Sequence, residues 1–104
     1  MARFNVIPSD DFNRDVKDHL RFVADVSIPA SRKLSGLFKK AIAGLADTAA
    51  SFPLFYKQYR KINVADRYAI FYEIIGNDVY VEYSHDMRTG VYNDIILENE
   101  QTDK

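Results

Sequence analysis

The chain has 104 residues, so we expect a single domain over residues 1–104, with a frayed tail at 98–104. It has no cysteine and two histidines, which excludes disulfides and thiolate chemistry and leaves no His-rich metal site. The formal net charge of −1 gives no support for general attraction to nucleic acid or membranes. With no visible secretion signal and no run of ~18 apolar residues, we expect a cytoplasmic protein without cofactor or metal.

The N-terminal stretch predicts a strand followed by an amphipathic helix. Apolar and polar residues alternate over residues 3–7, and Pro8 stops this strand. Ser9 is a typical helix N-cap, and two aspartates follow it in the first turn, where negative charge suits the helix dipole. His19 flanks the apolar side of this helix, and we interpret it as structural or exposed to solvent. The apolar stripe itself consists of Phe12, Val16, Leu20 and Val23.

A second amphipathic helix is predicted after a break at residues 27–29, where a proline disfavours helix in the residue before it. Two such helices, joined by a few residues, most simply form an antiparallel hairpin. The apolar stripe of the second helix consists of Leu34, Leu37, Phe38, Ala41, Ile42 and Leu45. Its basic residues form either a solvated face or a surface for a target or partner; they are Arg32, Lys33, Lys39 and Lys40.

From residue 59 onward the apolar period changes to two, which predicts three strands in a meander at residues 59–64, 67–75 and 78–84. Gly76 and Asn77 are a typical two-residue hairpin between the last two strands. Residues 91–100 are ambiguous between a short helix and a strand. We expect two sets of side chains each to share one face of its strand: Tyr68, Ile70, Tyr72 and Ile74, and then Val79, Val81 and Tyr83.

The predicted order of elements is β-α-α-β-β-β. Helices followed by a run of strands indicate an α+β fold. We expect the helical hairpin to pack on one face of a small, twisted, antiparallel meander sheet, which the N-terminal strand joins.

This order, with the residues in it, resembles the RelE/ParE superfamily of bacterial type II toxins over about residues 4–92. The stretches that carry the resemblance are FNVIPSDDFNRDV, AIAGLADTAASFP, YRKINVADRYAIFY and HDMR. Tyr59-Arg60 at the start of the meander is typical of the superfamily, and so is His85 followed by Arg88 after the last strand. The resemblance implies a toxin of a plasmid-stabilisation module that is neutralised by a cognate antitoxin.

The resemblance also implies two different activities. RelE-like members cut messenger RNA on the ribosome with clustered cations and a C-terminal tyrosine, because cations stabilise the charge that develops on the phosphorane. ParE-like members instead poison DNA gyrase by binding. Under the RelE-like alternative, the candidate catalytic residues are Arg60, His85, Arg88 and Tyr92.

The cation set is thin for an RNA-cutting enzyme. Ala69 and Ile62 stand where RelE-like members carry basic residues, and Asp86 stands at another such position. Residues 59–88 contain four basic and five acidic residues, a net charge of −1, whereas an RNA-cutting face should be positive. Structural roles also suit three of the candidates: His85 as a hydrogen-bonding residue, Arg88 as a partner of Asp86 or of the C-terminal acids, and Tyr92 as core.

We therefore interpret the chain as nearer to ParE than to RelE, and as a binding protein rather than an enzyme. The alternatives are a RelE-like endoribonuclease with a reduced cation set, which would engage ribosome and messenger RNA, and a detoxified relative that serves as an interaction module. A homodimer is left open. The candidate residues for binding a target or partner are Arg32, Lys33, Lys39, Lys40, Arg60, His85 and Arg88.

Overall fold

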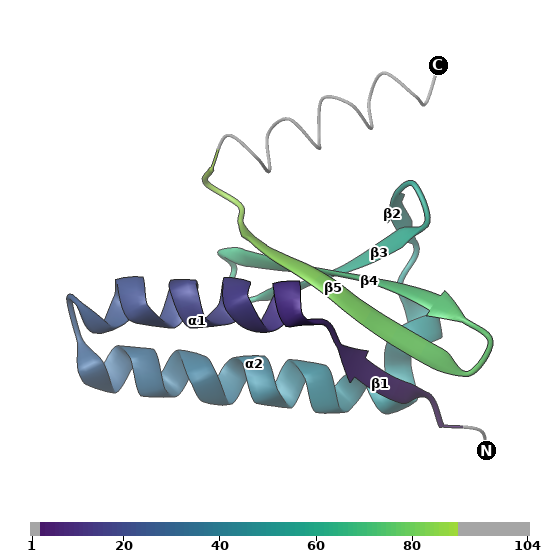
Figure 1. Cartoon of the computed structure of the whole chain (residues 1–104), viewed down its shortest axis with the longest axis horizontal. Helices are drawn as coiled ribbons and strands as arrows, with labels where there is room; N and C mark the ends of the chain where they lie inside the picture. Colours follow the sequence, from purple (N-terminus) through teal and green to yellow (C-terminus); the bar gives the residue numbers. More distant parts are fainter. Residues whose placement is uncertain (1–2, 90–104) are drawn as a thin grey trace.

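The computed structural model describes residues 3–89, and the predicted element at 91–100, the tail at 98–104 and Tyr92 lie outside this range. Within residues 3–89, two helices and five strands follow one another in the order that Figure 1 shows. The elements are β1 (Asn5–Pro8), α1 (Asp10–Ala24), α2 (Ile28–Thr48), a 3₁₀ turn (Ala49–Ser51), β2 (Leu54–Tyr56), β3 (Tyr59–Val64), β4 (Tyr68–Ile75) and β5 (Asp78–Asp86).

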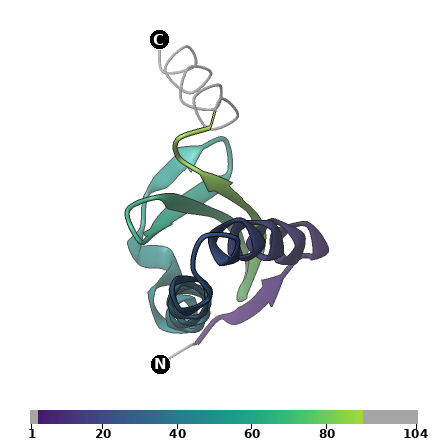
Figure 2. The ribbon, with the colours of Figure 1, turned by 90° about the vertical axis from the view of Figure 1, so that its left-hand side faces the viewer.

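The strands form one sheet in the order β1-β5-β4-β3-β2. β1 joins β5 in parallel, and the other neighbouring pairs are antiparallel. Both helices lie on one side of the sheet; Figure 2 shows α2 nearly end-on and α1 obliquely. The predicted α+β fold and meander are thus confirmed. β2 was not predicted, because its three residues are too few to show a period.

Ser9 ties the start of α1 to the sheet. Its hydroxyl oxygen accepts a hydrogen bond from the Phe12 backbone N–H at 3.0 Å, which confirms the predicted N-cap. The same hydroxyl donates to the Glu82 carbonyl oxygen on β5 at 3.0 Å. The cap therefore fixes where α1 begins and how its first turn sits against β5.

The core lies between the helical hairpin and the sheet, as both apolar stripes predict. Leu34, Phe38 and Leu45 of α2 are buried, while Leu37 is 38% exposed and faces away from the centre of the core. Val16, Leu20 and Val23 of α1 pack on the buried set. The sheet side of this core is formed by Ile62, Val64, Tyr68, Ile70, Tyr72, Val79 and Val81.

A β-bulge in β5 changes which face its later side chains reach. Phe71 of β4 pairs with Tyr83 and the next residue, Tyr72, pairs with Val81, so Glu82 has no partner on β4. Val79 and Val81 are buried in the core, but Tyr83 is 37% exposed. The predicted common face for these three residues is wrong for Tyr83, because the extra residue inverts the alternation after Val81.

The face of the sheet opposite the helices, which we name the open face, carries a second apolar cluster. Its buried members are Ala69 and Phe71, and Phe55, Tyr59 and Met87 pack against them. Aromatic residues of this sheet thus serve two clusters, one on each face.

Two buried tyrosines on one strand differ in how their hydroxyls are satisfied, which provides a matched test. The Tyr72 hydroxyl donates to the Ala49 carbonyl oxygen at 2.7 Å, whereas the Tyr68 hydroxyl is buried without a hydrogen-bond partner within residues 3–89. We expect Tyr72→Phe to lower the free energy of unfolding by about 1–2 kcal/mol, and Tyr68→Phe to leave it unchanged or raise it by up to about 1 kcal/mol. Urea denaturation of both variants measures this, and equal losses in the two would contradict it.

Candidate functional site

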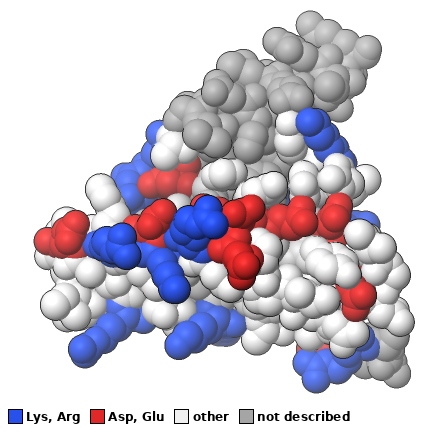
Figure 3. All heavy atoms as spheres, viewed as in Figure 1, with Lys and Arg blue, Asp and Glu red and all other residues white. Residues whose placement is uncertain are grey.

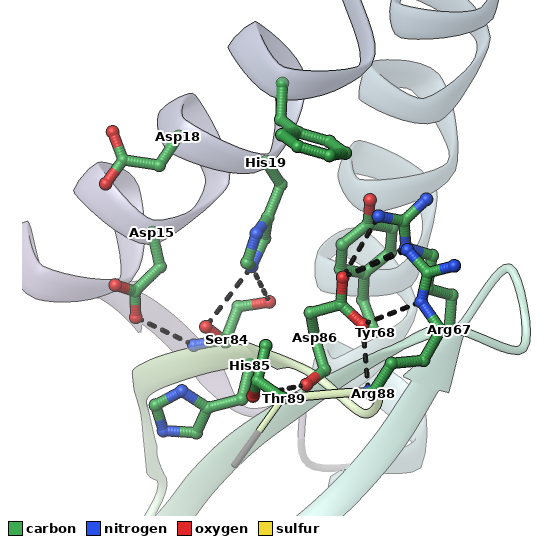
Figure 4. A pocket seen from close by; sticks show the side chains of 11 residues that line it. Asp15, Asp18, His19, Arg67, Tyr68, Ser84, His85, Asp86, Arg88 and Thr89 are labelled. Atoms are coloured by element: carbon green, nitrogen blue, oxygen red, sulfur yellow. Dashed lines mark hydrogen bonds and ion pairs between the residues drawn. The ribbon is translucent and has the colours of Figure 1, made fainter. Parts of the chain in front are cut away.

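A cavity of about 670 Å³ opens beside α1, at the end of the molecule where β4 begins and β5 ends. We name it the α1–β5 cavity. α1 contributes Asp15, Asp18, His19 and Phe22 to its lining. The other walls come from Arg67 and Tyr68, where β4 begins, and from the end of β5 and the turn after it: Ser84, His85, Asp86, Arg88 and Thr89. Figure 4 shows Asp15, Asp18 and His19 on one side of it, with Arg67 and Arg88 on the other. Its size is in the range of small-ligand or side-chain binding sites.

Ser84 joins α1 to β5 on the floor of this cavity. Its backbone N–H donates to the Asp15 carboxylate at 3.0 Å. Its carbonyl oxygen and its hydroxyl each lie 3.2 Å from Nε2 of His19. Because a carbonyl oxygen can only accept, Nε2 is the protonated nitrogen of that ring. The His19 ring also packs on Tyr68, with 4.6 Å between ring centroids, so His19 has a structural role.

Burial lowers the pKa of both histidines at this end of the sheet. For His19, loss of hydration outweighs the hydrogen bond with Ser84 and the charges of Asp15, Asp86 and Asp18, which act in the opposite direction. For His85, burial again dominates over the charge of Asp15. Both imidazoles are therefore biased toward the neutral form.

Two arginines share one carboxylate at the rim of the cavity. Arg67 donates to Asp86 through Nε at 3.1 Å and forms an ion pair at 3.0 Å. Arg88 binds the same carboxylate with its backbone N–H at 3.0 Å and lies 3.4 Å from it through Nε. Burial by itself would raise the pKa of Asp86, but these bonds from Arg88 and Arg67 outweigh it and lower that pKa. Arg88 thus pairs with Asp86, which is one of the two structural roles predicted for it; the other was a pairing with the C-terminal acids.

Arg60, another candidate catalytic residue, lies away from this cavity. Arg60 pairs across the sheet with Tyr72 and donates to the Phe52 carbonyl oxygen. Tyr72 lies four residues along β4 from Tyr68, the partner of Asp86, which is about 13 Å of strand. Asp86 and Arg60 are thus about 13 Å apart along the strand direction, on strands that lie on either side of β4.

His85 contributes to the cavity lining, but its ring lies among the aromatic side chains of the open face. Its ring stacks on Tyr83 with 6.0 Å between centroids and 11° between planes, and it contacts Phe71 at 5.6 Å. Figure 4 shows the imidazole directed away from His19 and Arg88. These contacts are aromatic, in place of the hydrogen bonds that its position at a strand end suggested.

The described part of the open face is mainly aromatic, and its Lys61 lies over the Phe55 ring, with Nζ 4.3 Å from the centroid. A cavity of about 230 Å³ there is lined by rings alone, from Tyr56, Tyr59, Phe71, Tyr83 and His85. Burial, and then a hydrogen bond with Glu82, raises the pKa of Tyr59 above its ordinary value, so this hydroxyl holds its proton firmly.

A second hollow, of about 550 Å³, runs between the two helices, and we name it the hairpin groove. Apolar side chains of both helices line it, with a lysine from each helix: Phe12, Val16, Lys17, Leu20, Lys39 and Ile42. Four of the basic residues predicted to bind a target or partner, Arg32, Lys33, Lys39 and Lys40, lie on α2, whose acidic residue is Asp47. They are on different sides of that helix, because Lys39 lines the hairpin groove whereas Lys40 lines a hollow against β3. Figure 3 shows basic side chains along the edge that α2 forms.

No helix within residues 3–89 is long and apolar enough to cross a membrane. The same residues contain no group of three or more His, Cys, Asp or Glu side chains that could hold a metal ion.

The family model for the ParE toxin of the type II toxin–antitoxin system parDE matches residues 6–82. The chain belongs to the ParE toxin family. A solved structure described as the chromosomal ParDE TA system from P. aeruginosa is similar to it, with a TM-score of 0.71 at 9% sequence identity. That similarity covers 83% of this chain and 98% of the other, and at this identity it shows a shared fold. A search of curated protein sequences finds no match.

Membership of the ParE family establishes the chain as a toxin component of a type II system. The matched region contains α1, α2 and the bulge residue Glu82. It ends before Ser84, Asp86 and Arg88, so one wall of the α1–β5 cavity lies beyond the part that the ParE model describes. Sequence reasoning missed Arg67, a cavity residue inside the matched region, because it directly precedes β4 and looked like a polar strand end. The approach of Arg67 to Asp86 depends on the register of β4 and β5.

The lowered pKa values of His19 and His85 predict how stability varies with pH. The unfolded chain binds protons at these residues near pH 6.5, and the folded toxin binds them only at lower pH. The free energy of unfolding should therefore decrease as the pH falls from about 7 to about 5. Asp86 contributes in a separate window, since its pKa is lowered from 3.8 and its contribution is lost below that value. Urea denaturation at a series of pH values should show that the free energy of unfolding varies less with pH in the double variant His19→Gln/His85→Gln than in the wild type. An equal variation with pH in both proteins would contradict this prediction.

Proposed function

We propose that a cognate antitoxin neutralises this toxin by placing an acidic, amphipathic segment in the hairpin groove. The observation that carries the proposal is the groove itself, an apolar hollow with Lys17 on one helix and Lys39 on the other. An amphipathic helix buries its apolar side in such a groove. Acidic residues along the edges of that helix would meet the two lysines, which favours encounter and fixes orientation.

The charge distribution of the helical hairpin supports an acidic occupant. α2 carries four basic residues and one acidic residue, and that acid, Asp47, is engaged by Arg3 at 3.0 Å. An antitoxin segment of this kind is expected to fold as it binds, and it can then cover the groove and part of the open face in one chain.

Lys39 and Lys40 provide a matched pair for testing the groove, because they are adjacent in sequence and lie on different sides of α2. We expect Lys39→Glu to weaken binding of the antitoxin encoded in the neighbouring reading frame by about tenfold, and Lys40→Glu by about twofold or less. Calorimetric titration of both variants measures the difference. Recovery of this toxin alone from its native operon, or an equal effect of the two substitutions, would contradict the proposal.

We also propose that the toxin acts in the cytoplasm by binding a protein target, with DNA gyrase as the candidate, rather than by cutting messenger RNA. The placement of the candidate residues supports this. Arg60 lies about 13 Å along the strands from the level of Asp86, Arg88 is bound to Asp86, and His85 stacks among aromatic rings. Loss of one group that stabilises a transition state typically costs about 10²–10³ in rate, so a dispersed and incomplete cation set leaves little cleavage.

Two assays on the same induced cells and purified toxin separate these activities. We expect inhibition of gyrase-driven supercoiling, lost on truncation after Gly90, together with intact transcripts in primer extension. Codon-specific cuts that disappear in Arg88→Ala or Tyr92→Phe would instead establish the RelE-like endoribonuclease. Normal growth on induction, with antitoxin binding retained, would favour the detoxified interaction module.

A further inference from the structure

We propose that the α1–β5 cavity is a second docking site of this toxin, which takes one acidic side chain of the antitoxin and the apolar residue next to it. This rests on the proposed function, because it names the same partner. The site is distinct from the hairpin groove: Lys17 and Leu20 of α1 line the groove, whereas Asp18, His19 and Phe22 line the cavity. The antitoxin would thus hold α1 from two sides.

The basic end of the cavity has one carboxylate for two guanidinium groups. Arg67 and Arg88 both bind Asp86 through their Nε edges, within 3.4 Å. Each guanidinium presents five N–H donors in a planar fork, so donors of both remain for another acceptor. The Arg88 side chain is 65% exposed and is accessible to a partner. The local charge of this cluster is +1, which suits one incoming carboxylate.

An apolar wall stands next to these donors. Phe22 is 61% exposed, although it lies on the packed part of α1. The guanidinium carbon of Arg67 lies 5.7 Å from the centroid of the Phe22 ring and 5.0 Å from that of Tyr68. These rings hold Arg67 in place before a partner arrives, and they offer an apolar surface beside it. A residue next to the bound acid would therefore cover Phe22.

The opposite wall of the cavity is acidic and determines at which end an acidic side chain can bind. Asp15 and Asp18 line it; Asp15 accepts the Ser84 N–H at 3.0 Å, and Asp18 lies 3.9 Å from Arg21. Both repel a second carboxylate on that side, so an acidic side chain is accepted at the arginine end alone. The cavity consequently selects an acid with an apolar neighbour rather than a run of acids.

The test measures the affinity of the antitoxin for two cavity variants of the toxin and for two matched control variants, each relative to the wild-type toxin. Arg88→Gln and Phe22→Ala should each weaken antitoxin binding by about tenfold. Arg14→Gln removes the same charge from an arginine that is 68% exposed, and Val26→Ala truncates a side chain that is 86% exposed. Neither lines the cavity, and each should change affinity by about twofold or less. Circular dichroism melts establish that all four variants fold.

The dependence on salt separates the electrostatic contribution to antitoxin affinity from the apolar contribution. The loss caused by Arg88→Gln should shrink at about 1 M NaCl, where the screening length is about 3 Å, whereas the loss caused by Phe22→Ala should persist. If the wild-type complex forms and Lys39→Glu weakens it, but both cavity variants bind normally, this inference fails and the groove proposal stands. An effect of Phe22→Ala without one of Arg88→Gln rules out the acidic side chain. If the wild-type toxin forms no complex, both proposals fall.

Discussion

One extra residue in β5 determines which side chains meet α1 and which lie on the open face. Glu82 has no partner on β4, so the alternation that places Val79 and Val81 in the core is inverted beyond it. Without this bulge, His85 would point toward α1, and Ser84 and Asp86 would lie on the open face. The Ser9 hydroxyl binds the carbonyl oxygen of the bulge residue and caps α1 at the same time. The register of β5 and the position of α1 are therefore fixed by the same contact.

The bulge accounts for the chemistry of both faces. Ser84 reaches Asp15 and His19 because of it, and Asp86 reaches Arg67 on the same side. On the open face it brings Tyr83 and His85 into contact with Phe71. The described part of the open face is mainly aromatic, and its Lys61 lies over the Phe55 ring, with Nζ 4.3 Å from the centroid. Stabilisation of a pentavalent phosphorane needs several converging cations. Relatives that share this fold can thus differ in activity through a few side chains on one sheet face.

The sequence predicted the elements whose apolar pattern repeats over many residues. It did not predict the features that depend on a single residue, such as the bulge at Glu82. Two helical stripes and two long strands each provide several turns or alternations of signal, so the hairpin and the meander were predictable. The bulge was not, because Glu82 reads as an ordinary outward-facing residue between Val81 and Tyr83. The α1–β5 cavity was missed for the same reason, since Asp15, Arg67 and Asp86 are distant in sequence and meet only in one register. A small polar residue, Ser84, within an apolar strand was the signal that could have indicated it.

The net charge of −1 is not evenly distributed, because the two helices differ in their balance of acidic and basic residues. This difference affects which partners each helix attracts. α2 has four basic residues against one acid, whereas α1 has Asp10, Asp11, Asp15 and Asp18 among three basic residues. Because charge is screened beyond about 10 Å at moderate salt, a partner responds to the helix that it touches and not to the whole chain. Acidic segments are therefore attracted along α2 and the hairpin groove, and are turned away from the acidic wall of α1. In the docking that we propose, a single acid would regain a favourable contact beyond that wall, at the Arg67–Asp86–Arg88 cluster, so charge would favour one direction for a chain that passes around α1.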